Sequence, residues 1–197
     1  MDILITPRLT LRPPIALDAD EITHWLQDWD VVKMLGRVNW PNTIEDAEKW
    51  IATMGDPEKQ LYTIHRQSLI GVAGFVGVGD TRNLGYWLAK PWHRQGFMRE
   101  ALTRLFDQVF SAGEIATITA GAVFDNPASL KLQESLGFKI TGETETISVP
   151  RKTKVKVITT VLTRKDWFAR EVWLGRAETG FSRKSQPHQQ QSSLFTA

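Results

Sequence analysis

The 197-residue sequence contains no cysteine, and its basic and acidic residues nearly cancel, at 24 against 22. Without cysteine the chain can form no disulfide, no thiolate nucleophile and no thiolate metal site. The net charge of +2, with no run of lysine or arginine, argues against a nucleic-acid surface. We therefore expect neither a bound metal nor a nucleic-acid partner.

Long apolar runs are also missing from the sequence. No stretch approaches the ~20 apolar residues that cross a bilayer, and the start of the chain, MDILITPRLTLRP, lacks the apolar segment of a secretion signal. We therefore expect a cytoplasmic protein without a membrane partner. The length suits one domain, which we place at residues 1–170, and the polar, Gln- and Ser-rich end is expected to be a tail over residues 171–197.

The hydrophobic periodicity predicts strands and helices that alternate along the chain. Strands are expected at 9–12, 61–65, 70–78, 83–88, 115–123, 138–146 and 155–163, and helices at 18–28, 43–54, 98–110 and 126–136, with residues 31–40 irregular. Thr43 with Asp46 nearly forms a capping box, and Asn126 followed by Pro127 marks a second helix start. The strand–helix–strand units indicate partly parallel pairing in a mixed sheet.

Residues 90–102, KPWHRQGFMREAL, place two arginines and a glycine at the start of a predicted helix, where the helix dipole is positive. Unpaired N–H groups there, with Arg94 and Arg99 beside them, would hold an anion, and Gly96 would let it approach the backbone. The alternative is a simple strand-to-helix connection with solvated arginines. A P-loop needs Gly-Lys-Ser/Thr and a dinucleotide fold needs GxGxxG, and neither pattern is present.

Four segments together resemble the GCN5-related N-acetyltransferase (GNAT) family, in its ribosomal-protein (Rim-type) branch. They are TPRLTLRP at 6–13, NWPNTIEDAEKWI at 39–51, GYWLAKPWHRQGFMREAL at 85–102 and DNPASLKLQESLGF at 125–138. The resemblance implies the α/β GNAT fold, a mostly antiparallel mixed sheet of about seven strands, splayed at the cofactor site and flanked by about four helices. It also implies acetyl transfer from acetyl-CoA to a primary amine, by direct attack.

The resemblance assigns a set of cofactor-binding residues around the opening of the predicted sheet. Backbone N–H groups of Arg94 to Met98 are expected to hold the pyrophosphate of acetyl-CoA, and main-chain groups of Trp87 and Leu88 to pair with its pantetheine arm. The full set is Trp87, Leu88, His93, Arg94, Gln95, Gly96, Phe97, Met98, Arg99, Asn126 and Ser129. His93 and Met98 depart from the family pattern, and the bulk of Met98 is expected to shape this cradle.

Catalysis by direct attack requires a proton for the departing thiolate. Many relatives place a tyrosine four residues before the Gly-Phe that follows this helix, but here that position is Gln133. Ser129 lies one helical turn earlier on the same face, and we expect it to be the proton donor. The alternative is that Ser129 interacts only with the backbone of the first helical turn.

The sequence offers several candidates for the general base. Asn83 occupies a position where many relatives have a glutamate. Glu143 and Glu145 share one face of the next strand by its period of two, and they are our candidates. Three histidines, His24, His65 and His93, are alternatives by their ordinary pKa range. An α-amine, with a pKa of about 8 against about 10.4 for lysine, would need only a water relay.

The acceptor site is expected at the first two helices, where aromatic residues gather. Trp25, Trp29, Trp40 and Tyr62 are the candidates to line it, and a tryptophan-rich core is the alternative reading. The acceptor would be a protein N-terminal α-amine or a small-molecule amine. Two other functions stay open: an acetyl-CoA-binding sensor without catalysis, and an enzyme that modifies an antibiotic. The chain is expected to act as a monomer or a homodimer.

Overall fold

A computed structural model describes residues 2–53, 59–67, 72–79 and 82–170 of the chain. The predicted helix stop at Gly55, the tight turn after residue 67, part of the turn after Gly79 and the predicted tail lie outside these residues. No helix in the described part is both long enough and apolar enough to cross a bilayer.

Five strands form one antiparallel sheet in the order β1-β2-β3-β4-β5. They are β1 (Leu4–Ile5), β2 (Leu9–Arg12), β3 (Gln60–Arg66), β4 (Val72–Val78) and β5 (Leu84–Leu88). Because side chains alternate between the two faces of a strand, the sheet carries two separate apolar clusters. Leu84 and Leu88 of β5 face one cluster and Trp87 faces the other.

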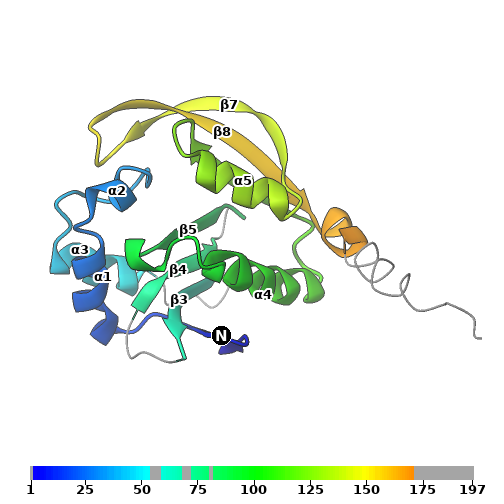
Figure 1. Cartoon of the computed structure of the whole chain (residues 1–197), viewed down its shortest axis with the longest axis horizontal. Helices are drawn as coiled ribbons and strands as arrows, with labels where there is room; N and C mark the ends of the chain where they lie inside the picture. The colour runs from blue at the N-terminus through cyan, green and yellow to red at the C-terminus, as the bar shows by residue number, and fades with distance from the viewer. Residues whose placement is uncertain (1, 54–58, 68–71, 80–81, 171–197) are drawn as a thin grey trace, which may run out of the picture.

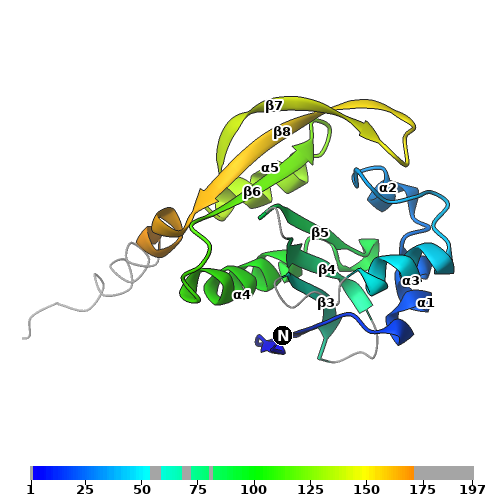
Figure 2. The same ribbon diagram turned by 180° about the vertical axis from the view of Figure 1, so that it is seen from behind.

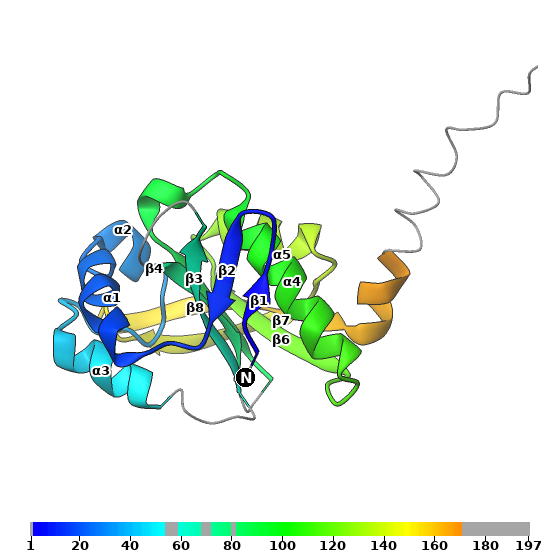
Figure 3. The same ribbon diagram turned by 90° about the horizontal axis from the view of Figure 1, so that it is seen from below.

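Helices cover both faces of this sheet (Figure 3). They are η1 (Ala16–Asp18), α1 (Ala19–Trp25), α2 (Trp29–Val32), α3 (Ile44–Ala52), η2 (Lys90–Trp92), α4 (Phe97–Ser111) and α5 (Pro127–Ser135). The apolar side of α4 packs into the cluster that contains Leu84 and Leu88, and α1, α2 and α3 pack into the cluster that contains Trp87. Burying these stripes of side chains is the main stabilisation of each layer.

Three further strands, β6 (Thr117–Val123), β7 (Lys139–Ser148) and β8 (Thr153–Thr163), form a second antiparallel sheet in the order β6-β8-β7. Strands β7 and β8 form a long hairpin that arches over α5, and its tip lies close to the end of α2 (Figure 1). At the tip, the N–H of Val149 donates to the carbonyl of Gly36 at 3.0 Å. The hairpin therefore connects the second sheet to the N-terminal helices.

The two sheets meet at an isolated parallel bridge, Asn83 with Thr119, and the described residues of β5 and β6 show no other ladder pairing (Figure 2). The predicted parallel pairing is thus reduced to this bridge, and all named strand pairs are antiparallel. Beyond the bridge the two strands separate. The fold is the predicted GNAT fold, an α/β architecture splayed between β5 and β6, with eight described strands instead of about seven.

Local sequence signals agree well with the helix ends. Thr43 Oγ1 accepts from the N–H of Asp46 and the Asp46 carboxylate accepts from the N–H of Thr43, both at 3.2 Å, which completes the capping box. Asn126 Oδ1 accepts from the N–H of Ser129 at 3.1 Å, as its N-cap position predicts. The segment expected to be irregular differs, because Asp28 caps a short helix, α2, by accepting from the N–H of Asp30 at 2.9 Å.

The last described residues pack tightly against α4. A helical segment begins after β8, and its Trp167 is fully buried, with its ring 5.2 Å from that of Phe106. Trp167 Nε1 donates to the carboxylate of Asp107 at 3.0 Å. Trp167 thus anchors the segment after β8 to α4.

Candidate active site

The loop before α4 presents backbone N–H groups to the outside. Arg94 and Gly96 both have left-handed backbone conformations, with φ of 60° and 80°. Gly96 is the N-cap of α4 and has no side chain with which to cap it. The N–H groups of the first helical turn, from Phe97 to Arg99, therefore have no side-chain cap. Such a cluster of N–H groups is a favourable site for an anion.

Two buried side chains and one arginine hold this loop in place. Phe97 and Met98 are both buried in the core, so they offer the loop's outer surface only their backbone. The side chain of Met98 therefore lies on the core side of this loop, and the effect of its bulk on the cradle stays a prediction. On the other side, Arg8 donates to the carbonyl of Gln95 at 2.9 Å and lies 4.5 Å over the Phe97 ring.

Arg8 also neutralises the acid in the first turn of α4. Its guanidinium contacts the Glu100 carboxylate at 2.6 Å, and Thr6 Oγ1 donates to the same carboxylate at 2.6 Å. Partial burial by itself raises the pKa of Glu100, but the hydrogen bonds from Thr6 and Arg8 outweigh it and hold that pKa below its usual value. The charge of Glu100 is thus compensated within the protein and does not oppose an anion in the cradle.

Arg94 and Arg99, in contrast, are exposed. Neither side chain forms a hydrogen bond or an ion pair with another residue in the part of the chain that the structure describes. The structure thus brings together the N–H groups and the two cations that the sequence predicted at this helix start. Sequence reasoning missed Arg8, because nothing local to residues 90–102 indicates that β2 reaches this loop.

His93 lies next to the end of β5. Its Nε2 donates to the carbonyl of Leu88 at 2.7 Å, and because a carbonyl can only accept, this nitrogen must carry a hydrogen. Leu88 and Trp87 bury their side chains on opposite faces of the sheet. With both side chains buried, the main chain of β5 is the part of this strand end to which the sequence analysis assigned the pantetheine arm.

A polar network fills the space between the two sheets just beyond the bridge at Asn83. Tyr86 Oη and Ser129 Oγ are 2.7 Å apart. Gln133 Nε2 donates to both oxygens, at 3.0 Å and 3.2 Å. Gln133 Oε1 in turn accepts from Thr160 Oγ1 at 2.7 Å. The four residues come from β5, α5 and β8, so the network joins both sheets and the helix between them.

Tyr86 was missed by the sequence reasoning, although a signal was present. Its position alternates with Leu84 and Leu88, which places its ring on the inner face of β5. Burial raises the pKa of the Tyr86 phenol above its usual value, and the hydrogen bonds with Ser129 and Gln133 offset part of that shift. The phenol is therefore protonated throughout the neutral pH range.

A third missed residue, Arg151, lies at the tip of the β7–β8 hairpin. Its Nε donates to the carbonyl of Lys33 at 2.6 Å, and its two terminal nitrogens contact the Asp125 carboxylate at 2.8 Å and 3.1 Å. These hydrogen bonds hold the pKa of Asp125 below its usual value. Asp125 precedes Asn126, the N-cap of α5, so Arg151 connects the segment after α2 to the start of α5.

The candidate bases lie apart from this network. Glu143 and Glu145 are on β7, the outer strand of the second sheet, and both are exposed. Lys156 Nζ contacts the Glu143 carboxylate at 2.9 Å. Among the histidines, His24 is exposed on α1 and His65 Nε2 is 2.9 Å from Thr63 Oγ1. Among the described residues, the hydrogen-bond partners of Ser129 are Tyr86, Asn126 and Gln133, and not these candidates.

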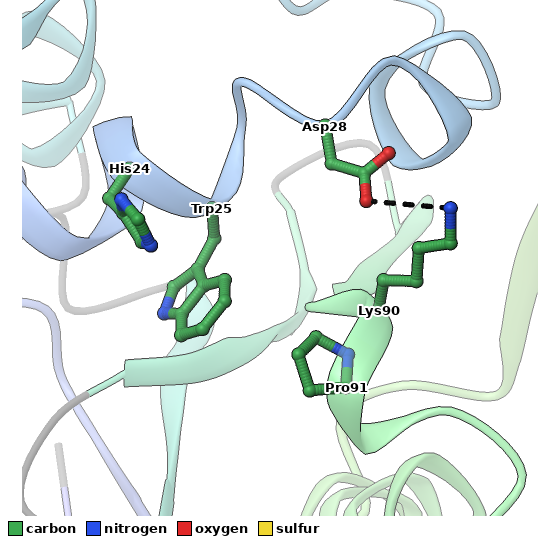
Figure 4. A pocket seen from close by; sticks show the side chains of 5 residues that line it. All are labelled: His24, Trp25, Asp28, Lys90 and Pro91. Atoms are coloured by element: carbon green, nitrogen blue, oxygen red, sulfur yellow. Dashed lines mark ion pairs between the residues drawn. The ribbon is translucent and has the colours of Figure 1, made fainter.

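The four aromatic candidates for the acceptor site divide into three locations. Trp25 lines a pocket of about 420 Å³ together with His24, Asp28, Lys90 and Pro91. Figure 4 shows Trp25 extending from α1 toward Pro91, beside the ion pair of Asp28 and Lys90. The Nε1 of Trp25 is buried and has no hydrogen-bond partner among the described residues.

The other three candidates lie outside this pocket. Trp29 and Trp40 pack against each other with ring centroids 4.7 Å apart, and they are 38% and 40% exposed. Tyr62 is 1% exposed in the main core, where its hydroxyl donates to Gln60 Oε1 at 2.9 Å. Within the described residues there is also no group of three or more acidic or histidine side chains arranged to hold a metal ion.

Comparison with known proteins gives a consistent result. A family model for the acetyltransferase (GNAT) domain matches residues 8–139. The chain is 31% identical to the uncharacterized N-acetyltransferase YoaA of Bacillus subtilis over 150 residues, which cover 71% of this chain and 84% of that protein. It is 26% identical over 116 residues to the ribosomal-protein-serine acetyltransferase of Escherichia coli, which covers 53% of this chain and 65% of that one.

Solved structures agree in fold. A ribosomal-protein α-N-acetyltransferase, RimL, solved in complex with coenzyme A, superimposes with a TM-score of 0.70 at 18% identity. The alignment covers 82% of this chain and 98% of that one.

Proposed function

The chain belongs to the GNAT family of acetyltransferases, and from that premise we propose that it transfers the acetyl group of acetyl-CoA to a primary amine. The acceptor is a protein N-terminal α-amine or a small-molecule amine. The observation that carries the proposal is the uncapped first turn of α4, with Arg94 and Arg99 exposed beside it and the acid Glu100 compensated by Arg8. The N–H groups from Arg94 to Met98 hold the pyrophosphate, and the left-handed Gly96 leaves room for it.

The remaining cofactor contacts follow the strand and helix that flank the opening. Main-chain groups of Trp87 and Leu88 pair with the pantetheine arm, and Asn126, at the start of α5, hydrogen-bonds to it. His93, which already contacts the Leu88 carbonyl, orients the end of this strand. When bound, acetyl-CoA supplies an acetyl thioester whose C–S bond breaks as the new C–N bond forms.

Ser129 supplies the proton that the reaction requires at sulfur. Its Oγ–H donates a proton to the sulfur as the C–S bond breaks, and Oγ is reprotonated by the proton that the attacking amine loses. The number of protons is then conserved at the site, and no metal is needed for the step. The hydrogen bonds that Ser129 Oγ forms with Tyr86 and Gln133 support this role.

The pocket beside Trp25 is the proposed acceptor site. It lies between α1 and the segment that follows β5, where the ring of Trp25 gives it an apolar wall and the ion pair of Asp28 and Lys90 a polar one. An α-amine is favoured over a lysine side chain by its protonation state. About a quarter of an α-amine with a pKa near 8 is neutral at pH 7.5, against about one lysine in a thousand. A water relay then suffices without a dedicated base.

Thiol release from acetyl-CoA, measured with a panel of acceptors, tests the proposal. The panel contains peptides with a free N-terminus, the same peptides with a blocked N-terminus and one internal lysine, polyamines and aminoglycosides. We expect turnover with the free N-termini or with a small amine, and about 100-fold lower kcat for Ser129→Ala. Tight acetyl-CoA binding without turnover on any acceptor would instead indicate a sensor.

The antibiotic-modifying function is tested in cells. Expression of the chain should leave the susceptibility of a host to aminoglycosides unchanged if a peptide is the acceptor. A reproducible loss of susceptibility, which disappears with Ser129→Ala, would favour the antibiotic over the peptide.

A further inference from the structure

The hydroxyl of Tyr86 occupies the space next to Gln133, the position at which the sequence lacks the expected tyrosine. Gln133 is fully buried, and Thr160 is nearly so, which leaves their amide and hydroxyl groups to be satisfied within the protein. The hydrogen bonds among Tyr86, Ser129, Gln133 and Thr160 distinguish Ser129 from an ordinary serine in the first turn of a helix.

The orientation of the Gln133 amide follows from its neighbours. With Nε2 toward the two hydroxyls, it donates to Tyr86 and Ser129 while Oε1 accepts from Thr160. With the amide reversed, Gln133 Oε1 would lie close to Tyr86 Oη and Ser129 Oγ, and these three oxygens would form three close pairs. The two hydroxyls supply only two hydrogens, so one of the three pairs would have no hydrogen between its oxygens. The first orientation satisfies every contact.

In that orientation the two hydroxyls share one hydrogen between them, and one hydroxyl hydrogen remains for a ligand. Both residues are partly exposed. If Ser129 donated to Tyr86, the remaining hydrogen would belong to the phenol, which packs against the apolar core and whose pKa is raised by burial. An unused donor in such surroundings is costly. If Tyr86 donates to Ser129, the remaining hydrogen belongs to Ser129 in the first turn of α5.

We propose that Tyr86 is a positioning residue for acetyl transfer, which donates its hydroxyl hydrogen to Ser129 Oγ and so directs the hydrogen of Ser129 into the opening between the sheets. Gln133 holds Tyr86 and Ser129 together, and Thr160 fixes Gln133. Two hydrogen bonds then reach Ser129 Oγ, and they stabilise the negative charge that develops there as its proton moves. This inference rests on the proposed role of Ser129.

A double-mutant cycle tests whether Tyr86 acts through Ser129. We expect Tyr86→Phe to lower kcat about 10-fold, because one hydrogen bond to a developing charge is lost. In the Ser129→Ala background the same change should have no further effect on kcat. An equal loss in both backgrounds, or a Tyr86→Phe enzyme within twofold of wild type, would overturn the proposal.

Tyr62→Phe is the matched control for a merely structural role. It removes the same hydroxyl from a tyrosine that is 1% exposed in the main core, where this hydroxyl donates to Gln60 Oε1 at 2.9 Å, and it keeps the contact of Tyr86 with Ser129. We expect its melting temperature to fall about as much as that of Tyr86→Phe, while kcat stays within about threefold of wild type. An equal fall of kcat in both variants would assign the effect to packing.

A second readout needs no turnover. The chain has two tyrosines, Tyr62 and Tyr86, so labelling the ζ carbon of tyrosine gives two NMR signals. Saturation with CoA should shift the signal of Tyr86 and leave that of Tyr62, which lies in the core, in place. CoA that binds by calorimetry without moving the Tyr86 signal would overturn this inference alone, whereas the absence of any CoA binding would overturn the proposed function itself.

Discussion

The two ends of the opening between the sheets are built in different ways. At the α4 end, the groups proposed to hold acetyl-CoA are backbone N–H groups of consecutive residues, 94 to 98, anchored by two buried side chains. At the α2 end, the contacts come from separate segments: residues 24–28 and 90–91 line the proposed acceptor site, and the hairpin tip at 149–151 bonds to residues 33–36. The proposed acetyl-CoA site therefore depends on one short motif. The proposed acceptor end depends on side chains that only the fold brings together.

Gly96→Asp is the substitution expected to have the largest effect on this comparison. It places a negative charge where the pyrophosphate is proposed to bind, and the left-handed φ of 80° adds strain for a residue with a Cβ. We expect acetyl-CoA affinity to fall at least about 100-fold, measured by calorimetry, with the circular dichroism spectrum retained.

Gly113→Asp is the matched control for Gly96→Asp. Gly113 follows the other end of the same helix, α4, and has a similar φ of 86°. It carries the same strain but lies away from the cradle, so acetyl-CoA affinity should stay within about twofold of wild type. Equal losses in the two variants would mean that strain, and not the proposed anion site, explains the effect.

Arg151→Ala should affect the other end of the opening. The variant loses the contacts that join the hairpin tip to the Lys33 carbonyl and to Asp125. Because Arg151 is a structural connection and not a ligand, we expect KM for the acceptor to rise about 5- to 10-fold while the Kd of acetyl-CoA changes less. Steady-state kinetics with both substrates varied measures the two effects separately.

Arg164→Ala is the control for Arg151→Ala. Arg164 also donates to a carbonyl, that of Gly113, at 3.2 Å, but it follows the opposite end of β8. Its loss should leave both substrate constants near their wild-type values. If Arg151→Ala raised the Kd of acetyl-CoA as much as the acceptor KM, the two ends would be one coupled site and the contrast between them would disappear.

What the sequence could predict follows the same division. The capping boxes, the helix limits and the anion cradle depend on residues within a few positions of one another, and the structure agrees with the predictions for Thr43 and Asn126. The resemblance to the GNAT family added the splay between two strands. The role of Met98 in the cradle stays a prediction, and the structure adds that its side chain is buried in the core.

Long-range contacts could not be read from the sequence. Arg8 reaches Glu100 across 92 positions, and Arg151 reaches Lys33 across 118. The spacing of residues along one sequence carries no information about which residues meet after such a long separation. Tyr86 is an intermediate case, because the period of two in β5 predicts an inward ring but not the partner that the ring meets on α5.

The pH dependence of stability offers the smallest and most specific test of the α2 end. Hydrogen bonds from Arg151 lower the pKa of Asp125 in the folded protein below the ~3.9 of an unfolded chain. A carboxyl with a lowered folded pKa adds stability above its unfolded pKa, and this stability is lost as pH falls through the folded value. The difference in melting temperature between wild type and Arg151→Ala should therefore be constant from pH 8 to about 5 and shrink below about pH 4.

The size of this effect is limited, because the Asp125 side chain is 39% exposed and water screens the pair. We expect the pH-dependent part to be about 2 °C or less by calorimetry, with no such change for Arg164→Ala. A wild-type-minus-Arg151→Ala difference that stays constant down to pH 2 would mean that Arg151 stabilises the hairpin tip through the Lys33 carbonyl alone. The α2 end would then be held by one neutral acceptor, and the start of α5 would be independent of the hairpin.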